Sequence, residues 1–207
     1  MTPWLHRERR AVHVNKGCPA VSLENRCIFT GMNIDSFKRK LKIVGVEEAR
    51  GLSPEELAGW SILSIRSKMK EGPLSFPGAR STKSIHFDDV EDDFPEEQEF
   101  AAKPEDIQEA LEFSRGIDDG PLLIHCHMGI SRSTAIAWII IYDKLKGKPD
   151  AVRSSFEIVR KLRPILSPNR HVLRLGVEAL AQKGSRKRVM QQFHDCLEEI
   201  NPQHETA

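Results

Sequence analysis

The strongest constraint on the fold is one stretch near the middle of the chain, where an apolar run, a glycine-containing loop and a second apolar run follow one another. Residues 121–124 form a short apolar segment that is typical of a buried strand. Residues 135–142 are apolar almost all round, which predicts a buried helix. A loop that enters a helix N-terminus in this way binds anions, because its free N–H groups and the helix dipole favour negative charge at one point.

The loop between these two segments carries side chains suited to attack on an oxyanion. Cys126 lies where loop N–H groups, the helix end and Arg132 would all favour a thiolate over a thiol. A thiolate in such a site can attack a bound tetrahedral oxyanion, and the guanidinium of Arg132 can bind two of its oxygens at once. Ser133 can donate to the sulfur and help it leave in a second step, and Gly129 allows close approach of the backbone. A buried cysteine after a strand is more often inert, but this complete pattern favours catalysis.

The loop also carries a family resemblance. The string His125-Cys126-His127-Met128-Gly129-Ile130-Ser131-Arg132-Ser133 resembles the signature of the cysteine-dependent protein tyrosine phosphatases, and its second half is closest to the dual-specificity branch. With residues 167–170, it is most similar to small bacterial tyrosine-phosphatase-like proteins, and the resemblance covers residues 28–200 approximately. It implies hydrolysis of phosphotyrosine, with phosphoserine and phosphothreonine as further substrates, through a phosphocysteine on Cys126. It implies no cofactor and no metal, and it assigns phosphoryl binding to His127, Met128, Gly129, Ile130, Ser131 and Arg132.

A phosphatase of this kind needs a carboxylic acid that protonates the leaving oxygen and then activates water. The candidates follow a predicted strand end and are Asp88, Asp89, Asp92 and Asp93. The resemblance, which puts the acid at such a strand end before the cysteine, places it on Asp89, with Asp88 and Asp92 as the next choices. The other acids of residues 88–97 are expected to form a solvated acidic loop.

Two further residues are expected to support the site from outside it. His125 is expected to point away from the substrate and to fix the loop by hydrogen bonds, and not to bind a metal. Asn169 matches a Pro-Asn pair of the dual-specificity branch, which implies that it braces the loop, and asparagine is also a good helix N-cap. His127 either faces the rim of the site or is simply exposed, and Met128 makes part of the wall apolar. The loop lacks the lysines of phosphoinositide phosphatases, so a lipid substrate is not expected.

The rest of the chain alternates between strand and helix signals, which predicts an α/β domain with a mainly parallel central sheet flanked by helices, as in the tyrosine phosphatases. Strands are expected at residues 28–32, 60–65, 84–90 and 121–124. Helices are expected to begin at Asp35, which would include Phe37, Leu41 and Val44, and at Ser53, Pro104, Asp150 and Asn169, with a last one over residues 189–200. The cysteine falls at the carboxyl end of its strand, where such sheets bind ligands.

Length and composition set the remaining expectations. The chain has 207 residues, enough for one phosphatase domain over residues 28–200, with a basic extension at 1–27 and a tail at 201–207. The formal net charge of +1 gives no indication of a nucleic-acid partner, and no apolar run reaches membrane-spanning length. Four cysteines without a paired framework, and the lack of a signal-peptide segment, favour a cytoplasmic protein. A monomer is expected that acts on a phosphorylated protein or a small phosphomonoester.

Two other functions remain open from the sequence. A rhodanese-type sulfurtransferase also uses a loop cysteine in an anion site, but it requires neither Ser133 nor an upstream acid. A non-catalytic module that binds phosphoproteins is disfavoured, because Cys126, Arg132 and a candidate acid are all present. Thiocyanate formation from thiosulfate would identify the first alternative, and lack of turnover on an aryl phosphate would identify the second.

Overall fold

The computed structural model describes residues 40–68, 74–92, 95–117 and 120–200. The chain divides into two units, residues 1–31 and 32–207, and every described residue belongs to the second. The basic extension, the strand expected at 28–32 and the tail at 201–207 lie outside the described residues.

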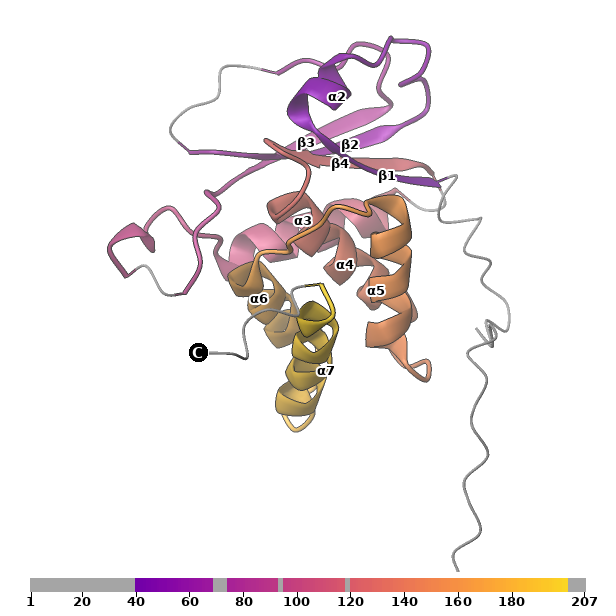
Figure 1. Cartoon of the computed structure of the whole chain (residues 1–207). Helices are drawn as coiled ribbons and strands as arrows, with labels where there is room; N and C mark the ends of the chain where they lie inside the picture. Colours follow the sequence, from indigo (N-terminus) through magenta and orange to yellow (C-terminus); the bar gives the residue numbers. More distant parts are fainter. Residues whose placement is uncertain (1–39, 69–73, 93–94, 118–119, 201–207) are drawn as a thin grey trace, which may run out of the picture. The chain divides into compact units, whose positions relative to one another are not determined.

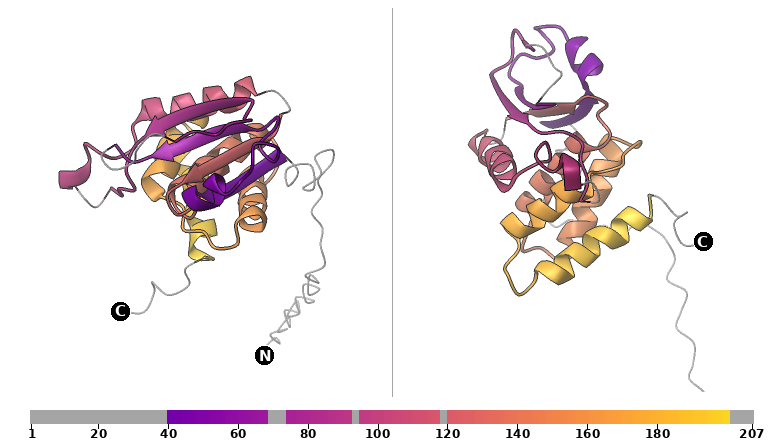
Figure 2. Two further views of the ribbon diagram at one scale, coloured as in Figure 1. Left: turned by 90° about the horizontal axis from the view of Figure 1, so that it is seen from above. Right: turned by 90° about the vertical axis from the view of Figure 1, so that its left-hand side faces the viewer.

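Four parallel strands form the sheet: β1 (Leu41–Gly45), β2 (Ser61–Arg66), β3 (Ser81–His86) and β4 (Leu122–Cys126), in the order β1-β4-β2-β3. The short helix α2 (Val46–Arg50) lies on one face of this sheet, and the remaining helices lie on the other (Figure 1). Figure 2 shows the same arrangement of sheet and helices from above and from the side. The α/β class with a parallel sheet flanked by helices is therefore confirmed.

Burial along each strand follows its place in the sheet. All residues of β2 and β4, the two inner strands, are buried, as expected for parallel strands that are covered on both faces. The edge strand β1 alternates between buried and half-buried positions, and β3 alternates between exposed positions and more buried ones, of which only Ile85 is fully buried. The apolar segment before Cys126 is therefore an inner strand, which holds the start of the loop rigidly.

The larger helical layer is built around α4 (Arg132–Leu145), which is buried almost all round, as the sequence predicts. Helices α3 (Pro104–Gly116), α5 (Ala151–Leu162) and α6 (Arg170–Leu180) pack around it, and α7 (Arg186–Glu198) packs on α5 and α6. A single 3₁₀ turn, η1 (Pro95–Glu97), lies in the acidic segment. Among the described residues no helix has the length and apolar character needed to cross a bilayer.

The strand expected at residues 84–90 lies earlier in the chain, since β3 ends at His86. Two further sequence predictions about local structure are wrong. Leu41 and Val44 belong to β1 and not to a helix, because burial alternates along residues 41–45 with the period of a strand. Ser53 does make the predicted capping contacts, since its N–H donates to Glu56 Oε2 at 2.8 Å and its Oγ accepts from the Glu56 N–H at 3.3 Å. These contacts close only a turn, because the chain reverses at Gly59 (φ +82°) to enter β2.

Candidate active site

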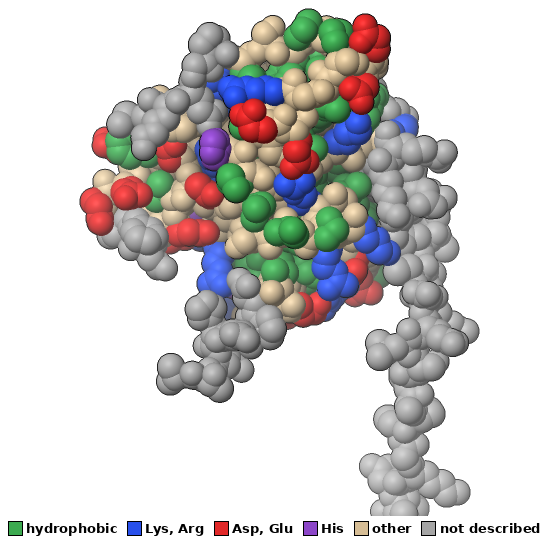
Figure 3. Space-filling view, turned by 45° about the horizontal axis from the view of Figure 1, so that its top comes forward, with side chains coloured by type: hydrophobic (Ala, Val, Ile, Leu, Met, Phe, Trp, Pro, Cys, Tyr) green, Lys and Arg blue, Asp and Glu red, His purple; other side chains and the backbone are tan. Residues whose placement is uncertain are grey.

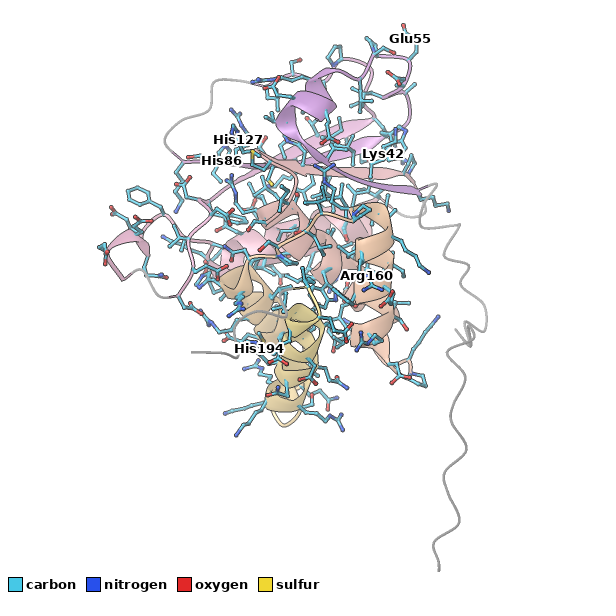
Figure 4. The ribbon with its side chains drawn as sticks, viewed as in Figure 1. Lys42, Glu55, His86, His127, Arg160 and His194 are labelled. Atoms are coloured by element: carbon cyan, nitrogen blue, oxygen red, sulfur yellow. The ribbon has the colours of Figure 1, made fainter. Side chains whose placement is uncertain are left out.

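The carboxyl ends of the four parallel strands meet at one edge of the sheet, where ligands of such sheets bind. Cys126 ends β4 there, and its register partner is Gly45, the last residue of β1. Figure 4 shows His86, at the end of β3, and His127, in the loop after β4, at this same edge. Residues 127–131, which connect β4 to α4, are named the catalytic loop below.

The sulfur of Cys126 lies among groups that stabilise negative charge. The residue is 2% exposed, and the Gly129 N–H donates to its Sγ at 3.3 Å. Its Sγ is hydrogen-bonded to Ser133 Oγ at 3.2 Å, and this hydroxyl can donate to the sulfur in the thiolate form. Because α4 begins at Arg132, the positive end of a 14-residue helix also lies next to the sulfur. These groups would stabilise negative charge on the sulfur.

The carbonyl groups of the catalytic loop are bound from outside the loop. His127 O accepts from the Val46 N–H at 3.0 Å, and Ile130 O accepts from the Ser167 N–H at 3.0 Å. Met128 O accepts from Arg163 Nη2 at 3.2 Å. A trans peptide carries its N–H opposite its C=O, so each of these bonds turns the following N–H away from the outer partner. The N–H that follows Met128 O in this way is that of Gly129, which donates to Cys126 Sγ.

Arg132 is placed to bind two oxygens of that anion. Its side chain is 7% exposed, and Nη1 donates to Phe87 O at 3.0 Å, which fixes the plane of the guanidinium. Its Nε is buried and has no hydrogen-bond partner within the described part of the chain. A buried, unpaired donor of a charged group is costly, and a bound oxyanion beside Cys126 would satisfy it.

Asp89 is brought to the catalytic loop from the end of β3. Its Oδ1 accepts from Ser131 Oγ at 2.6 Å and from Asn169 Nδ2 at 2.9 Å, while the side chain remains exposed to solvent. Ser131 directly precedes Arg132, so these bonds hold a carboxyl group at the residue next to Arg132. No hydrogen bond of the described residues joins the side chain of Asp88 to the loop, and Asp93 lies outside the described residues.

Asp92, the other candidate for the acid, is held in a different network. Both of its carboxylate oxygens accept from Arg174 at 3.0 Å, and Oδ1 lies 2.5 Å from His171 Nδ1. The hydrogen bonds from Arg174 lower the pKa of the Asp92 carboxyl to about 2, against the opposing effect of partial burial. Arg174 therefore holds Asp92 as a carboxylate in an ion pair. This ion pair ties the segment after Asp89 to α6.

Comparison with known proteins identifies the fold. No family model matches the sequence, and no curated protein matches it. Among solved structures, it is similar to the human tyrosine phosphatase-like serine/threonine/tyrosine-interacting protein, with a TM-score of 0.50 and 19% identity over 68% of this chain and 91% of that one. The chain has the fold of a protein tyrosine phosphatase. The Yvh1 phosphatase domain from Chaetomium thermophilum is also similar, with a TM-score of 0.48 and 23% identity over 66% of this chain and 87% of that one.

Within this tyrosine-phosphatase fold, the two supporting residues lie behind the site. His125 is 1% exposed, its Nε2 lies 2.7 Å from Ser64 Oγ, and its ring packs edge-on against Phe76. Asn169 is the N-cap of α6, since its Oδ1 accepts from the Val172 N–H at 2.9 Å. Its Nδ2 donates to Asp89 Oδ1, so Asn169 contacts Asp89 rather than the catalytic loop itself.

His127 and Met128 are the exposed residues of the loop, and Met128 is 62% exposed. The other large hydrophobic side chain exposed in the described residues, Ile165 at 73%, lies in the segment that binds the loop through Arg163 and Ser167. Apolar surface therefore adjoins the anion-binding backbone. On the face of the molecule in Figure 3, basic, acidic and hydrophobic side chains are intermixed, so neither charge dominates that face.

The sequence reasoning missed Ser64 and Arg163, which lie 61 residues before His125 and 35 residues after Met128 along the chain. No local sequence signal marks either residue, because each acts on the loop only through the tertiary fold. Among the described residues, no group of His, Cys, Asp and Glu is arranged to hold a metal ion.

Proposed function

We propose that this chain is a phosphomonoester hydrolase that forms a phosphocysteine on Cys126. The main support for the proposal is the set of groups around the sulfur atom of Cys126. Cys126 Sγ lies 3.3 Å from the Gly129 N–H and 3.2 Å from Ser133 Oγ, at the N-terminus of α4, next to a guanidinium with an unpaired buried donor. This combination suits a sulfur that attacks an anion and later departs as an anion.

In the first step, the Cys126 thiolate attacks phosphorus, and the bond from phosphorus to the ester oxygen breaks. The leaving oxygen takes a proton from Asp89. The Oδ1 atom of this carboxyl group accepts hydrogen bonds from both Ser131 and Asn169. The proton to be transferred would then lie on Oδ2. Arg132 binds phosphoryl oxygens with the donors that do not contact Phe87 O.

In the second step, water attacks the phosphocysteine, and the Asp89 carboxylate accepts one of its protons. The sulfur–phosphorus bond breaks, and the electron pair returns to Cys126. Ser133 Oγ, at 3.2 Å, donates to the departing thiolate and lowers the cost of this charge. The products are inorganic phosphate and the regenerated thiolate, and the step uses no metal or cofactor.

The proposed substrate class is phosphotyrosine, in a protein or as a small aryl phosphate, with phosphoserine and phosphothreonine as further substrates. The support is the apolar surface of Met128 and Ile165 beside the anion site, which suits an aromatic ring next to the phosphate. The free thiol of Cys126 is compatible with a reducing compartment such as the cytoplasm.

Turnover of an aryl phosphate and of a phosphotyrosine peptide by the wild type and by Cys126→Ser tests the function. We expect the wild type to release phosphate from both, and Cys126→Ser to release none while it still binds phosphate analogues. Retained activity in Cys126→Ser would contradict the proposal. Formation of thiocyanate from thiosulfate and cyanide would indicate a sulfurtransferase instead, and binding of the phosphopeptide without wild-type turnover would indicate a binding module.

A further inference from the structure

Arg163, the residue that follows α5, joins the catalytic loop to the opposite face of the sheet. Its Nη2 donates to Met128 O at 3.2 Å. The same guanidinium pairs with Glu48 of α2, through Nη1 at 3.0 Å and Nη2 at 2.8 Å. The hydrogen bond from Arg163 is the largest of the effects that lower the pKa of the Glu48 carboxyl. The guanidinium is therefore fixed on one side by a carboxylate and on the other by the loop.

Burial of the Arg163 side chain in this position is unfavourable in free energy. Its side chain is only 21% exposed, and its Nε is buried with no hydrogen-bond partner in the described part of the chain. Leaving a buried donor of a charged group unpaired is unfavourable. The hydrogen bonds and ion pair of the two Nη atoms must offset the cost of the unpaired Nε. One of these hydrogen bonds is to Met128 O in the backbone of the catalytic loop.

The contact with Met128 O decides which way the next N–H points. Because the peptide between Met128 and Gly129 is planar, holding its C=O toward Arg163 turns its N–H the other way. That N–H belongs to Gly129 and donates to Cys126 Sγ at 3.3 Å. Gly129 has a φ of +72°, and glycine accepts a wider range of backbone conformations than other residues. The contact from Arg163 to Met128 O holds this peptide in the orientation that directs its N–H to the sulfur.

We propose that Arg163 is a positioning residue that holds the Met128–Gly129 peptide with its N–H on Cys126 Sγ, and that Glu48 holds Arg163. Its role in turnover rests on the proposed function, but its effect on the sulfur does not. Arg163 acts through the peptide and does not itself contact the sulfur. The neighbouring bond from the Val46 N–H to His127 O is made by backbone alone, so Arg163 is the side chain through which this half of the loop is held.

Alkylation of Cys126 by iodoacetamide tests the proposal without a phosphorylated substrate. The rate is measured from pH 5 to pH 9, approximately the range over which cysteine thiols titrate in proteins, and peptide mapping assigns the label. Burial raises the pKa of the Cys196 thiol to about 11, so Cys196 should contribute little label near neutral pH. The variants are Arg163→Gln, Arg163→Lys and Glu48→Gln, with Arg160→Gln as the matched control. Arg160 lies on α5, is as exposed as other surface arginines, and pairs with Glu157 of its own helix.

We expect Arg163→Gln to slow alkylation of Cys126 at neutral pH about tenfold, as for loss of one hydrogen bond to an ionised group. The pH of half-maximal rate should rise. Glu48→Gln should act in the same direction by about threefold, since it loosens Arg163 without removing it. Arg163→Lys should recover part of the loss, because an ammonium group can still donate to Met128 O. Arg160→Gln should match the wild type.

Turnover on an aryl phosphate gives the second readout. We expect kcat of Arg163→Gln to fall by about the same factor as alkylation, with little change in KM, because the affected group is the nucleophile. Unchanged alkylation with a raised KM would overturn the proposal and make Arg163 a substrate-binding residue. Equal slowing of alkylation in Arg160→Gln would also overturn it. Slower alkylation of Arg163→Gln in a protein whose wild type has no phosphatase activity would instead refute the proposed function and leave the positioning role intact.

Discussion

Replacing Gly129 with alanine tests how closely the catalytic loop must pack on the end of β1. Gly129 has a φ of +72°, and a Cβ built on it would lie 2.5 Å from the Gly45 nitrogen and 2.5 Å from the Val44 carbonyl carbon. Both are backbone atoms that cannot rotate away, so the loop must shift. The shift displaces the Gly129 N–H, which lies 3.3 Å from Cys126 Sγ.

The expected losses of stability and of kcat in Gly129→Ala can both be estimated. The left-handed conformation costs alanine about 1–2 kcal/mol, and an extra carbon in a tightly packed place adds about 1–3 kcal/mol. For a chain of this length about 1 kcal/mol corresponds to about 2–4 °C in Tm, so the expected decrease is about 4–20 °C. Loss of a hydrogen bond to the ionised sulfur, about 1.5–3 kcal/mol, should lower kcat between about tenfold and about a hundredfold.

Gly147→Ala is the matched control, because Gly147 has a φ of +87° and no atom within 4 Å of its built Cβ. It requires the same backbone conformation without the collision, so its Tm should fall by about 2–8 °C and its kcat should not change. The assays are thermal unfolding and turnover of an aryl phosphate for both variants. Equal losses of Tm and of kcat in the two variants would refute the close packing of the loop on β1.

Three further predictions concern charged side chains of the site. Arg132→Lys keeps the charge but loses the two-pronged hydrogen bonding, so kcat should fall on the order of a hundredfold or more; unchanged kcat/KM would contradict this. Asp89→Asn should lose about a hundredfold in kcat on phosphotyrosine, less on an aryl phosphate with an acidic phenol, and should flatten the basic limb of the pH–rate profile. If Asp88→Asn shows these losses in place of Asp89→Asn, the acid is misassigned. Since Arg174 lowers the pKa of Asp92 from 3.8 to about 2, the ionised Asp92 stabilises the fold above about pH 4, and this contribution is lost as the pH falls through about 2. Between these pH values Tm should therefore fall less in Asp92→Asn than in the wild type, and parallel pH curves would show that the ion pair contributes nothing.

The fold class and the place of Cys126 in it were predictable from the sequence because their signals are local. An apolar run, a loop with Cys126 and Arg132, and an apolar helix follow one another within 25 residues, so spacing alone places the cysteine at a strand end before a helix N-terminus. Burial of α4 on all sides was predictable for the same reason, since almost every residue of 135–142 is apolar.

The first described strand was not predictable in this way. Residues 41–45 are too few to distinguish a strand period from a helical one, and Leu41 and Val44 fit helical spacing if Phe37 is counted with them. Pairing with β4 decides the matter, because the parallel register puts Leu41 opposite Leu122 and Gly45 opposite Cys126. Tertiary contacts therefore outweigh the local pattern.

The residues that orient the site depend on contacts that the sequence does not display. Arg163 meets Glu48 across 115 residues, and Asn169 meets Asp89 across 80 residues. Asn169 was found only through a motif, and the motif did not reveal that it binds Asp89. Arg163 carries the same charge as the surface arginines around it, and only the structure shows that one of its nitrogens is bonded to the catalytic loop.

Trapping the covalent intermediate tests the central claim most directly. The Asp89→Asn variant should form the phosphoenzyme and hydrolyse it slowly, because the base that activates water is missing. The variant is mixed with an aryl phosphate, quenched in acid and digested, and the phosphorylated peptide is identified by mass spectrometry. We predict one phosphoryl group on Cys126, and none when Cys126→Ser is combined with Asp89→Asn. A phosphoryl group on Ser133 or His127, or wild-type turnover with no phosphoenzyme in any variant, would contradict the account.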